Sequence, residues 1–210
     1  MKKSGALTLA EINLLKKQSF TAESPGTVLK NFGVLLEFIA NGVDVSARSH
    51  LLAIKALPVI NEKLSHSLTL KLKRPQQKSY PHINGLFLFL RASGLSKIVV
   101  TKKGAKLVLD ASSLNCWHTL NITEQYFTLL ESWLYRGNPE IIGEKTARWD
   151  FYLFFSDLRY FFEKLKNGLN VKERADGYYN LKYCPGLANL ALMQMFGWIE
   201  IELDAAMDEN

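Results

Sequence analysis

The chain has 210 residues, of which 48% are hydrophobic and 22% charged, with a net charge of +6. This composition is too apolar for a disordered chain, and the length suits one large domain or two of about 100 residues each. The longest apolar run, residues 85–90, is far shorter than the roughly 20 residues of a membrane-spanning helix, and the N-terminus shows no secretion signal. We therefore expect a folded cytoplasmic protein with no membrane segment.

The charge is unevenly divided along the chain. Residues 1–112 contain 17 Lys or Arg and 6 Asp or Glu, a net charge of +11, whereas residues 113–210 contain 9 and 14, a net charge of −5. A basic half suggests a polyanionic partner, because each phosphate that it neutralises releases counterions. Lysine-rich faces also serve solubility alone, and this alternative stays open. We predict an arm at 1–24, a basic domain at 25–112 and an acidic, aromatic-rich domain at 113–210.

The N-terminal arm has irregularly spaced leucines, which predict a short helix that is either flexible or docked on the body. Ser24 is then a candidate N-cap, and Pro25 suits the first position of a helix. Apolar residues at helical spacing continue to Ile39, after which Asn41 and Gly42 supply a left-handed stop. This stretch predicts the first core helix of the basic domain.

Two elements follow a short extended segment at residues 43–46. A second helix is predicted with Leu57, Ile60 and Leu64 on one face. Residues 68–74 then alternate between apolar and polar side chains, which is typical of a strand.

The last part of the basic domain is a helix followed by a hairpin. Pro81 opens the helix and Gly94 closes it, and the β-rich runs 95–100 and 105–109 flank a turn that contains glycine. Helix, short strand, helix, helix and hairpin is the order of a winged helix, whose third helix often enters the DNA major groove. Here that helix is apolar around nearly its whole circumference, so we expect it to be buried.

The candidate nucleic-acid-binding residues are therefore basic side chains around this helix and on the hairpin. The set comprises Lys71, Lys73, Arg74, Lys78, Arg91, Lys97, Lys102 and Lys103. Contacts to phosphates alone give binding that is weakly specific for sequence. The alternative is a protein-interaction or oligomerisation scaffold without nucleic-acid binding, whose second half meets another protein or a C-terminal domain.

The acidic half repeats part of the same plan. Thr123 is expected to cap a helix, and residues 149–162 predict a second, very aromatic helix whose spacing favours core or interface packing over base stacking. Pro185 and Gly197 then bound a further helix, and residues 198–203 alternate like a strand. The sequence thus predicts a mainly helical α+β protein with tandem winged-helix-like units, the second of them partial.

The search for catalytic chemistry is negative. The chain carries no phosphate-binding glycine loop, nucleophile elbow or kinase signature, so we predict neither an enzyme nor a cofactor. Cys116 and His118 lie close in sequence, but a structural zinc site takes four ligands, and we expect no metal. His50, His66 and His82 are scattered, and we expect them at the surface or at helix caps.

Four short stretches of the chain carry a family resemblance. They are residues 73–82, 90–95, 120–127 and 130–134. Together they resemble the N-terminal region of a family of bacterial hypothetical proteins related to an open reading frame from a root-inducing plasmid. The resemblance covers residues 27–136. It implies a bacterial, intracellular, multi-domain origin with a further C-terminal α+β domain, and it implies no catalytic residue.

Overall fold

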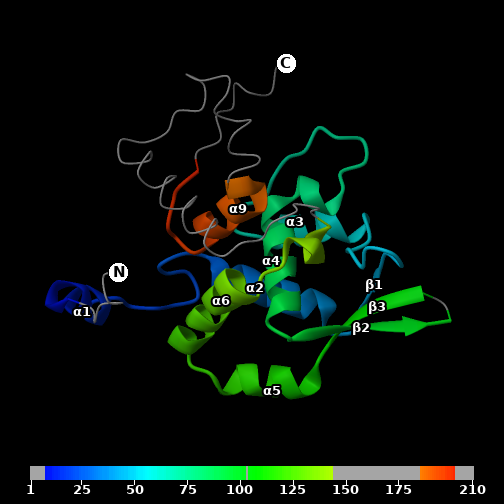
Figure 1. Cartoon of the computed structure of the whole chain (residues 1–210). Coiled ribbons are helices and arrows are strands. Elements are labelled where there is room, and N and C mark those ends of the chain that lie inside the picture. The colour runs from blue at the N-terminus through cyan, green and yellow to red at the C-terminus, as the bar shows by residue number, and fades with distance from the viewer. Residues whose placement is uncertain (1–7, 103, 144–184, 202–210) are drawn as a thin grey trace, which may run out of the picture.

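The structure is a computed structural model that describes residues 8–102, 104–143 and 185–201. It combines helices with one small antiparallel sheet (Figure 1), which confirms the predicted α+β class. None of the helices within these ranges is both long and apolar enough to span a bilayer. The helices are α1 (Leu9–Lys16), α2 (Val28–Ile39), α3 (Ala56–Lys63), α4 (Pro81–Ala92), α5 (Ala111–Thr119), α6 (Ile122–Arg136) and α9 (Leu187–Met195), with short 3-10 turns η1 (Gln77–Ser79) and η2 (Pro139–Ile142).

The sheet has three strands in the order β1–β3–β2. Strands β2 (Ser96–Thr101) and β3 (Gly104–Leu109) form a hairpin, and β1 (Val43–Val45) pairs with the other edge of β3. The predicted hairpin and short strand are therefore confirmed. The hairpin projects from the body of the molecule, with its turn at the far end (Figure 1).

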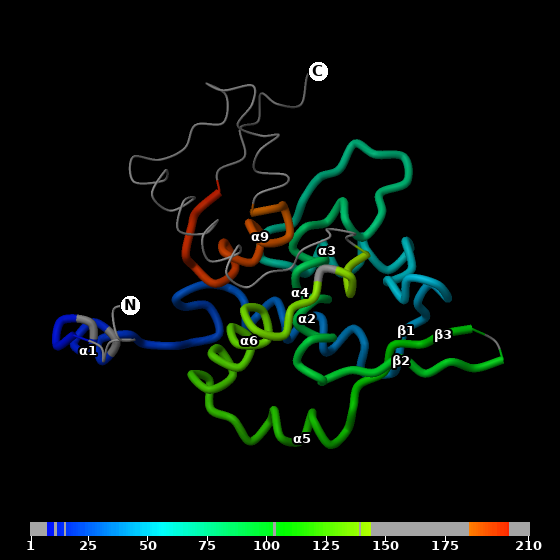
Figure 2. The backbone as a smooth tube through the Cα atoms, viewed as in Figure 1, coloured from blue at the N-terminus to red at the C-terminus, as the bar shows by residue number. Residues whose placement is uncertain are grey.

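Helix α4 lies at the centre of the helices. Every residue from His82 to Leu90 is buried, and α2, α3, α6 and α9 all pack against this helix. The backbone trace places α9, from the C-terminal end of the described chain, beside α4 (Figure 2). The predicted burial of the third helix is confirmed, so α4 offers no free face to a DNA groove.

One buried cluster joins residues from both predicted halves of the chain. Trp133 of α6 stacks on Phe196 at a centroid distance of 5.4 Å, and Phe89 of α4 meets the same ring edge-on at 5.6 Å. The Trp133 indole N–H donates to Asn189 Oδ1 at 2.9 Å, which satisfies its buried polar atom. The basic and acidic parts of the sequence therefore meet in one core.

The start of the first core helix differs from the prediction. Helix α2 begins at Val28 after Thr27 and not at Pro25. At Gly26 the backbone instead packs closely against α9, since a Cβ atom there would overlap the carbonyl oxygen of Met195. The chain at this point runs along the end of α9 before it enters α2.

The cap of α6 also differs from the prediction. Asn121, not Thr123, is the N-cap: its Oδ1 accepts from the Glu124 N–H at 3.0 Å, and Glu124 Oε2 accepts from the Asn121 N–H at 2.8 Å. This reciprocal pair satisfies two amides at the helix start. The preceding helix α5 is absent from the predicted elements, because Trp117 is its one buried residue and its apolar pattern is weak.

Two predicted strands are wrong. Residues 68–72 belong to no helix or strand, residues 73 and 74 form a bend, and no described strand lies beside them, so their alternating pattern produces no ladder. Residues 198–201 form no strand either, because the chain turns back on α9 after Gly197 and the Trp198 N–H donates to the Met193 carbonyl at 2.9 Å. The rest of that predicted strand and the aromatic helix predicted at 149–162 lie outside the described residues.

Candidate nucleic-acid interface

The basic charge of the chain is concentrated in one continuous segment. Residues 63–109 contain ten Lys or Arg and no Asp or Glu. The segment includes a long loop over residues 64–78, called the basic loop below, then α4 and the β2–β3 hairpin. Because α4 is buried, most of this charge is presented by the basic loop and the hairpin, which project from separate parts of the molecule (Figure 1).

The first half of the basic loop is fixed by asparagines of two helices. Asn61 of α3 forms two hydrogen bonds with the backbone of Leu68. Its Nδ2 donates to the Leu68 carbonyl at 2.9 Å, and its Oδ1 accepts from the Leu68 N–H at 3.0 Å. Asn31 of α2 accepts from the Ser65 N–H at 3.0 Å. Both side chains are buried, so the loop leaves the body along a defined path.

The other end of the basic loop is fixed by Gln77. Its buried side chain accepts from the Leu52 N–H and donates to Asn84 Oδ1, both at 2.9 Å. A capping box between Gln76 and Ser79 closes the short turn η1. The exposed stretch from residue 71 to residue 74 therefore lies between two anchored ends.

The predicted cations of this loop are accessible to solvent. Lys71, Lys73, Arg74 and Lys78 are all exposed. Within the described ranges no carboxylate lies at ion-pair distance from Lys73, Arg74 or Lys78. These side chains can therefore turn toward a phosphate without breaking an ion pair of the described structure.

The hairpin presents its charges differently. Lys97 Nζ lies 3.0 Å from Asp110 Oδ2, so this cation already has a carboxylate partner. The Ser113 N–H and the Lys97 ammonium together lower the pKa of Asp110 to about 2. Lys102 is exposed at the hairpin turn, whereas Lys103 lies outside the described residues.

Arg91 lies apart from both groups, in the last turn of α4. It is half-buried, and burial lowers the pKa of its guanidinium. Among the residues that the structure describes, the predicted cations therefore lie on the basic loop, on the hairpin and, for Arg91, in α4, and they do not form one cluster (Figure 1).

The structure brings together two histidines that the sequence keeps 16 residues apart. The rings of His66 and His82 stack at 5.7 Å, and His82 Nε2 lies 2.8 Å from Gln194 Oε1. His82 is buried and its Nδ1 has no hydrogen-bond partner among the described atoms. The expectation that His82 lies at the surface or at a helix cap is wrong as to the surface, because the residue is buried where α9 covers the start of α4.

Burial lowers the pKa of His82, the hydrogen bond to Gln194 opposes this shift, and the neighbouring His66 lowers the pKa further. The ring is therefore held in its neutral form near pH 7. No local sequence pattern indicates this pair, since it depends on the packing of α9 and the basic loop around α4.

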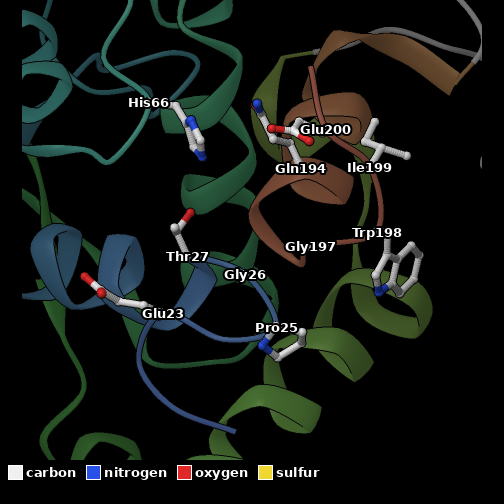
Figure 3. Close-up of a pocket in the computed structure, with 10 residues that line it drawn as sticks. All are labelled: Glu23, Pro25, Gly26, Thr27, His66, Gln194, Gly197, Trp198, Ile199 and Glu200. Atoms are coloured by element: carbon white, nitrogen blue, oxygen red, sulfur yellow. The ribbon is translucent and has the colours of Figure 1, made fainter. Parts of the chain in front are cut away.

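His66 also borders an open groove of about 420 Å³ (Figure 3). His66 and Gln194 lie on facing sides of it, and Thr27 at the start of α2 lies below them. The groove also has two carboxylates, Glu23 and Glu200, and Glu23 pairs with Lys30 at 2.6 Å. These carboxylates disfavour a phosphate here, so the groove is not part of the candidate interface.

The part of the chain that the structure describes contains no candidate metal site. No group of three His, Cys, Asp or Glu side chains there is placed to hold an ion. Cys116 is an exposed free thiol, and Cys184 lies outside the described residues.

No protein-family model matches the chain, no curated protein matches its sequence, and no solved structure matches it. The resemblance to a bacterial family described above stays a prediction. Function is therefore inferred from the residues and their placement alone.

Proposed function

We propose that the chain binds nucleic acid through the phosphate backbone, using the basic loop and the β2–β3 hairpin, without reading bases through α4. One observation carries the proposal: residues 63–109 hold ten cations and no acidic residue, and the loop and hairpin expose most of them. A surface of this kind binds polyanions because the displaced counterions gain entropy.

The order of elements supports the proposal. Three helices, α2, α3 and α4, precede the hairpin, and β1 completes the sheet on the far edge of β3, as in a winged helix. In that fold the hairpin lies on the backbone of the duplex and the third helix enters the groove. Because other helices cover α4, we propose that the protein contacts the phosphate backbone but does not insert α4 into a groove. A second such unit in the acidic half stays a prediction.

The test is a titration of labelled duplex DNA by fluorescence anisotropy at several salt concentrations. The variant Lys73→Glu/Arg74→Glu removes two phosphate contacts, so we expect at least about tenfold weaker binding near 50 mM salt and a log–log salt slope less negative by about 2. The matched control, Lys16→Glu/Lys17→Glu on and just after α1, changes the net charge by the same amount outside the segment.

The control separates a local interface from a general effect of charge. We expect it to weaken binding much less than the loop variant does. Equal weakening by both variants, or no binding by the wild type at low salt, contradicts the proposal.

Exposed apolar side chains favour a second candidate, a protein-interaction scaffold. Leu9 and Leu14 of α1, and Phe127 and Tyr135 of α6, are large and exposed, and α1 lies apart from the body (Figure 1). A scaffold of this kind predicts no duplex binding in the same titration, which distinguishes the two functions.

A further inference from the structure

An exposed leucine lies in the middle of the most basic stretch of the chain. Leu72 is 58% exposed, and its neighbours are Lys71 on one side and Lys73 and Arg74 on the other. A single exposed leucine is ordinary on a protein surface. Its position between three cations is not explained by packing or by solubility.

The path of the loop places this leucine beyond the core. Leu68 and Leu70, earlier in the same stretch, are half-buried, and Leu70 packs against the core. From residue 71 to residue 74 every side chain is exposed, and the chain bends at residues 73 and 74. Leu72 therefore stands at the outer part of the basic loop, immediately before the bend.

The basic loop is also anchored at both ends by hydrogen bonds. Asn61 fixes the backbone of Leu68, and Gln77 fixes the return of the loop through Leu52 and Asn84. A segment anchored at both ends loses less conformational freedom on binding than a free loop does. Leu72 and its flanking cations are thus presented in a restricted region of space.

We propose that Leu72 is a wedge that inserts between two base pairs of double-stranded DNA, while Lys73 and Arg74 hold the neighbouring phosphates. This inference rests on the proposed function and adds the mode of contact. Apolar wedges of this size unstack one base step and bend the duplex. Pyrimidine–purine steps such as TA unstack most easily, so the preferred partner is a duplex that contains such a step.

An anionic bilayer is the other partner that attracts cations around an apolar side chain. One leucine is a weak membrane anchor, because even a myristoyl chain, which is much larger, gives only marginal and reversible binding. A base step, in contrast, accommodates a single apolar side chain. The observations therefore favour duplex DNA.

The experiment measures bending of a duplex of about 30 base pairs, labelled at its two ends with a donor and an acceptor dye, on addition of the full chain at low salt. The duplexes carry either a central TA step or a central G·C-rich step. We expect the wild type to raise energy transfer and to bind the TA duplex at least about fivefold more tightly. Leu72→Ala is expected to keep the salt slope of binding but to lose the bending and the preference.

Two further variants make the result specific. Leu9→Ala removes the same side chain from α1, outside the basic segment, and is expected to bend the duplex like the wild type. Leu72→Phe supplies another wedge residue and is expected to retain bending.

The remaining outcomes overturn either the wedge or the proposed function. Equal bending by the wild type and Leu72→Ala, or no bending by either, overturns the wedge while leaving phosphate binding intact. No binding by the wild type at low salt overturns the proposed function itself. Sedimentation with vesicles rich in phosphatidylserine that Leu72→Ala abolishes, without any bending of DNA, overturns the wedge in favour of a membrane contact.

Discussion

At the scale of single residues, the basic loop depends on polar side chains that lie outside it or at its end. Asn31 and Asn61 belong to helices, and Gln77 belongs to the turn η1 at the end of the loop. All three side chains are buried, and a buried polar group left without its hydrogen-bond partner costs about 1–3 kcal/mol. These side chains, and not the lysines, determine where the charged stretch lies.

His82 is expected to make the free energy of unfolding depend on pH. Its pKa in the folded protein lies below the ordinary value of 6.5, so the unfolded chain takes up a proton more readily than the folded one. The free energy of unfolding is therefore unaffected by this group well above pH 6.5 and falls as the pH drops below 6.5 toward the folded pKa.

The measurement is urea unfolding at about pH 7.5 and about pH 5.5 for the wild type and His82→Gln. We expect the stability loss on acidification to be smaller in His82→Gln, because the substituted side chain does not titrate. His118→Gln, at an exposed histidine, is the control and should behave like the wild type. An identical loss in all three proteins would show that His82 does not contribute.

At the scale of elements, the contact between α4 and α9 determines what the fold can present to a partner. Gly85 lets the two helices approach closely, since a Cβ atom there would lie 2.6 Å from Leu192 Cδ2. With α9 in this position, residues 82–90 are covered. The same contact therefore makes the core continuous and removes α4 from any groove.

Gly85→Ala is expected to destabilise the protein by about 1–3 kcal/mol, because overpacking outweighs the gain of about 1 kcal/mol in helix propensity. Gly33→Ala in α2 is the matched control, since a Cβ atom added at Gly33 would meet nothing within 4 Å beyond its own turn of helix, and it should stabilise the protein by up to about 1 kcal/mol. Urea unfolding measures both. A stabilised Gly85→Ala would contradict the close packing of α4 on α9.

Some of the helices and strands follow from local sequence patterns and others do not. Proline and glycine punctuation predicts α4, and β-rich runs around a glycine predict the hairpin, because these signals are local. The strand predicted at 68–74 is wrong because alternation cannot reveal whether a neighbouring strand exists. Helix α5 escapes prediction because most of its surface faces solvent.

At the scale of the whole molecule, the sequence identifies the basic residues but not their grouping. Net charge by segment is visible in the sequence, whereas the pairing of Lys97 with Asp110 and the separation of loop from hairpin depend on the tertiary fold. The stacking of His66 on His82 also depends on the tertiary fold. The described molecule is thus a helical core with basic projections, and we assign binding to those projections.

Hydrogen–deuterium exchange of the full chain, free and with saturating duplex DNA at low salt, tests this assignment most directly. We predict slower exchange in residues 64–78 and 96–109 when DNA is added, with α4 unchanged because it stays buried. Faster exchange in α4 on DNA binding, or protection confined to α1 and α6, would contradict the assignment.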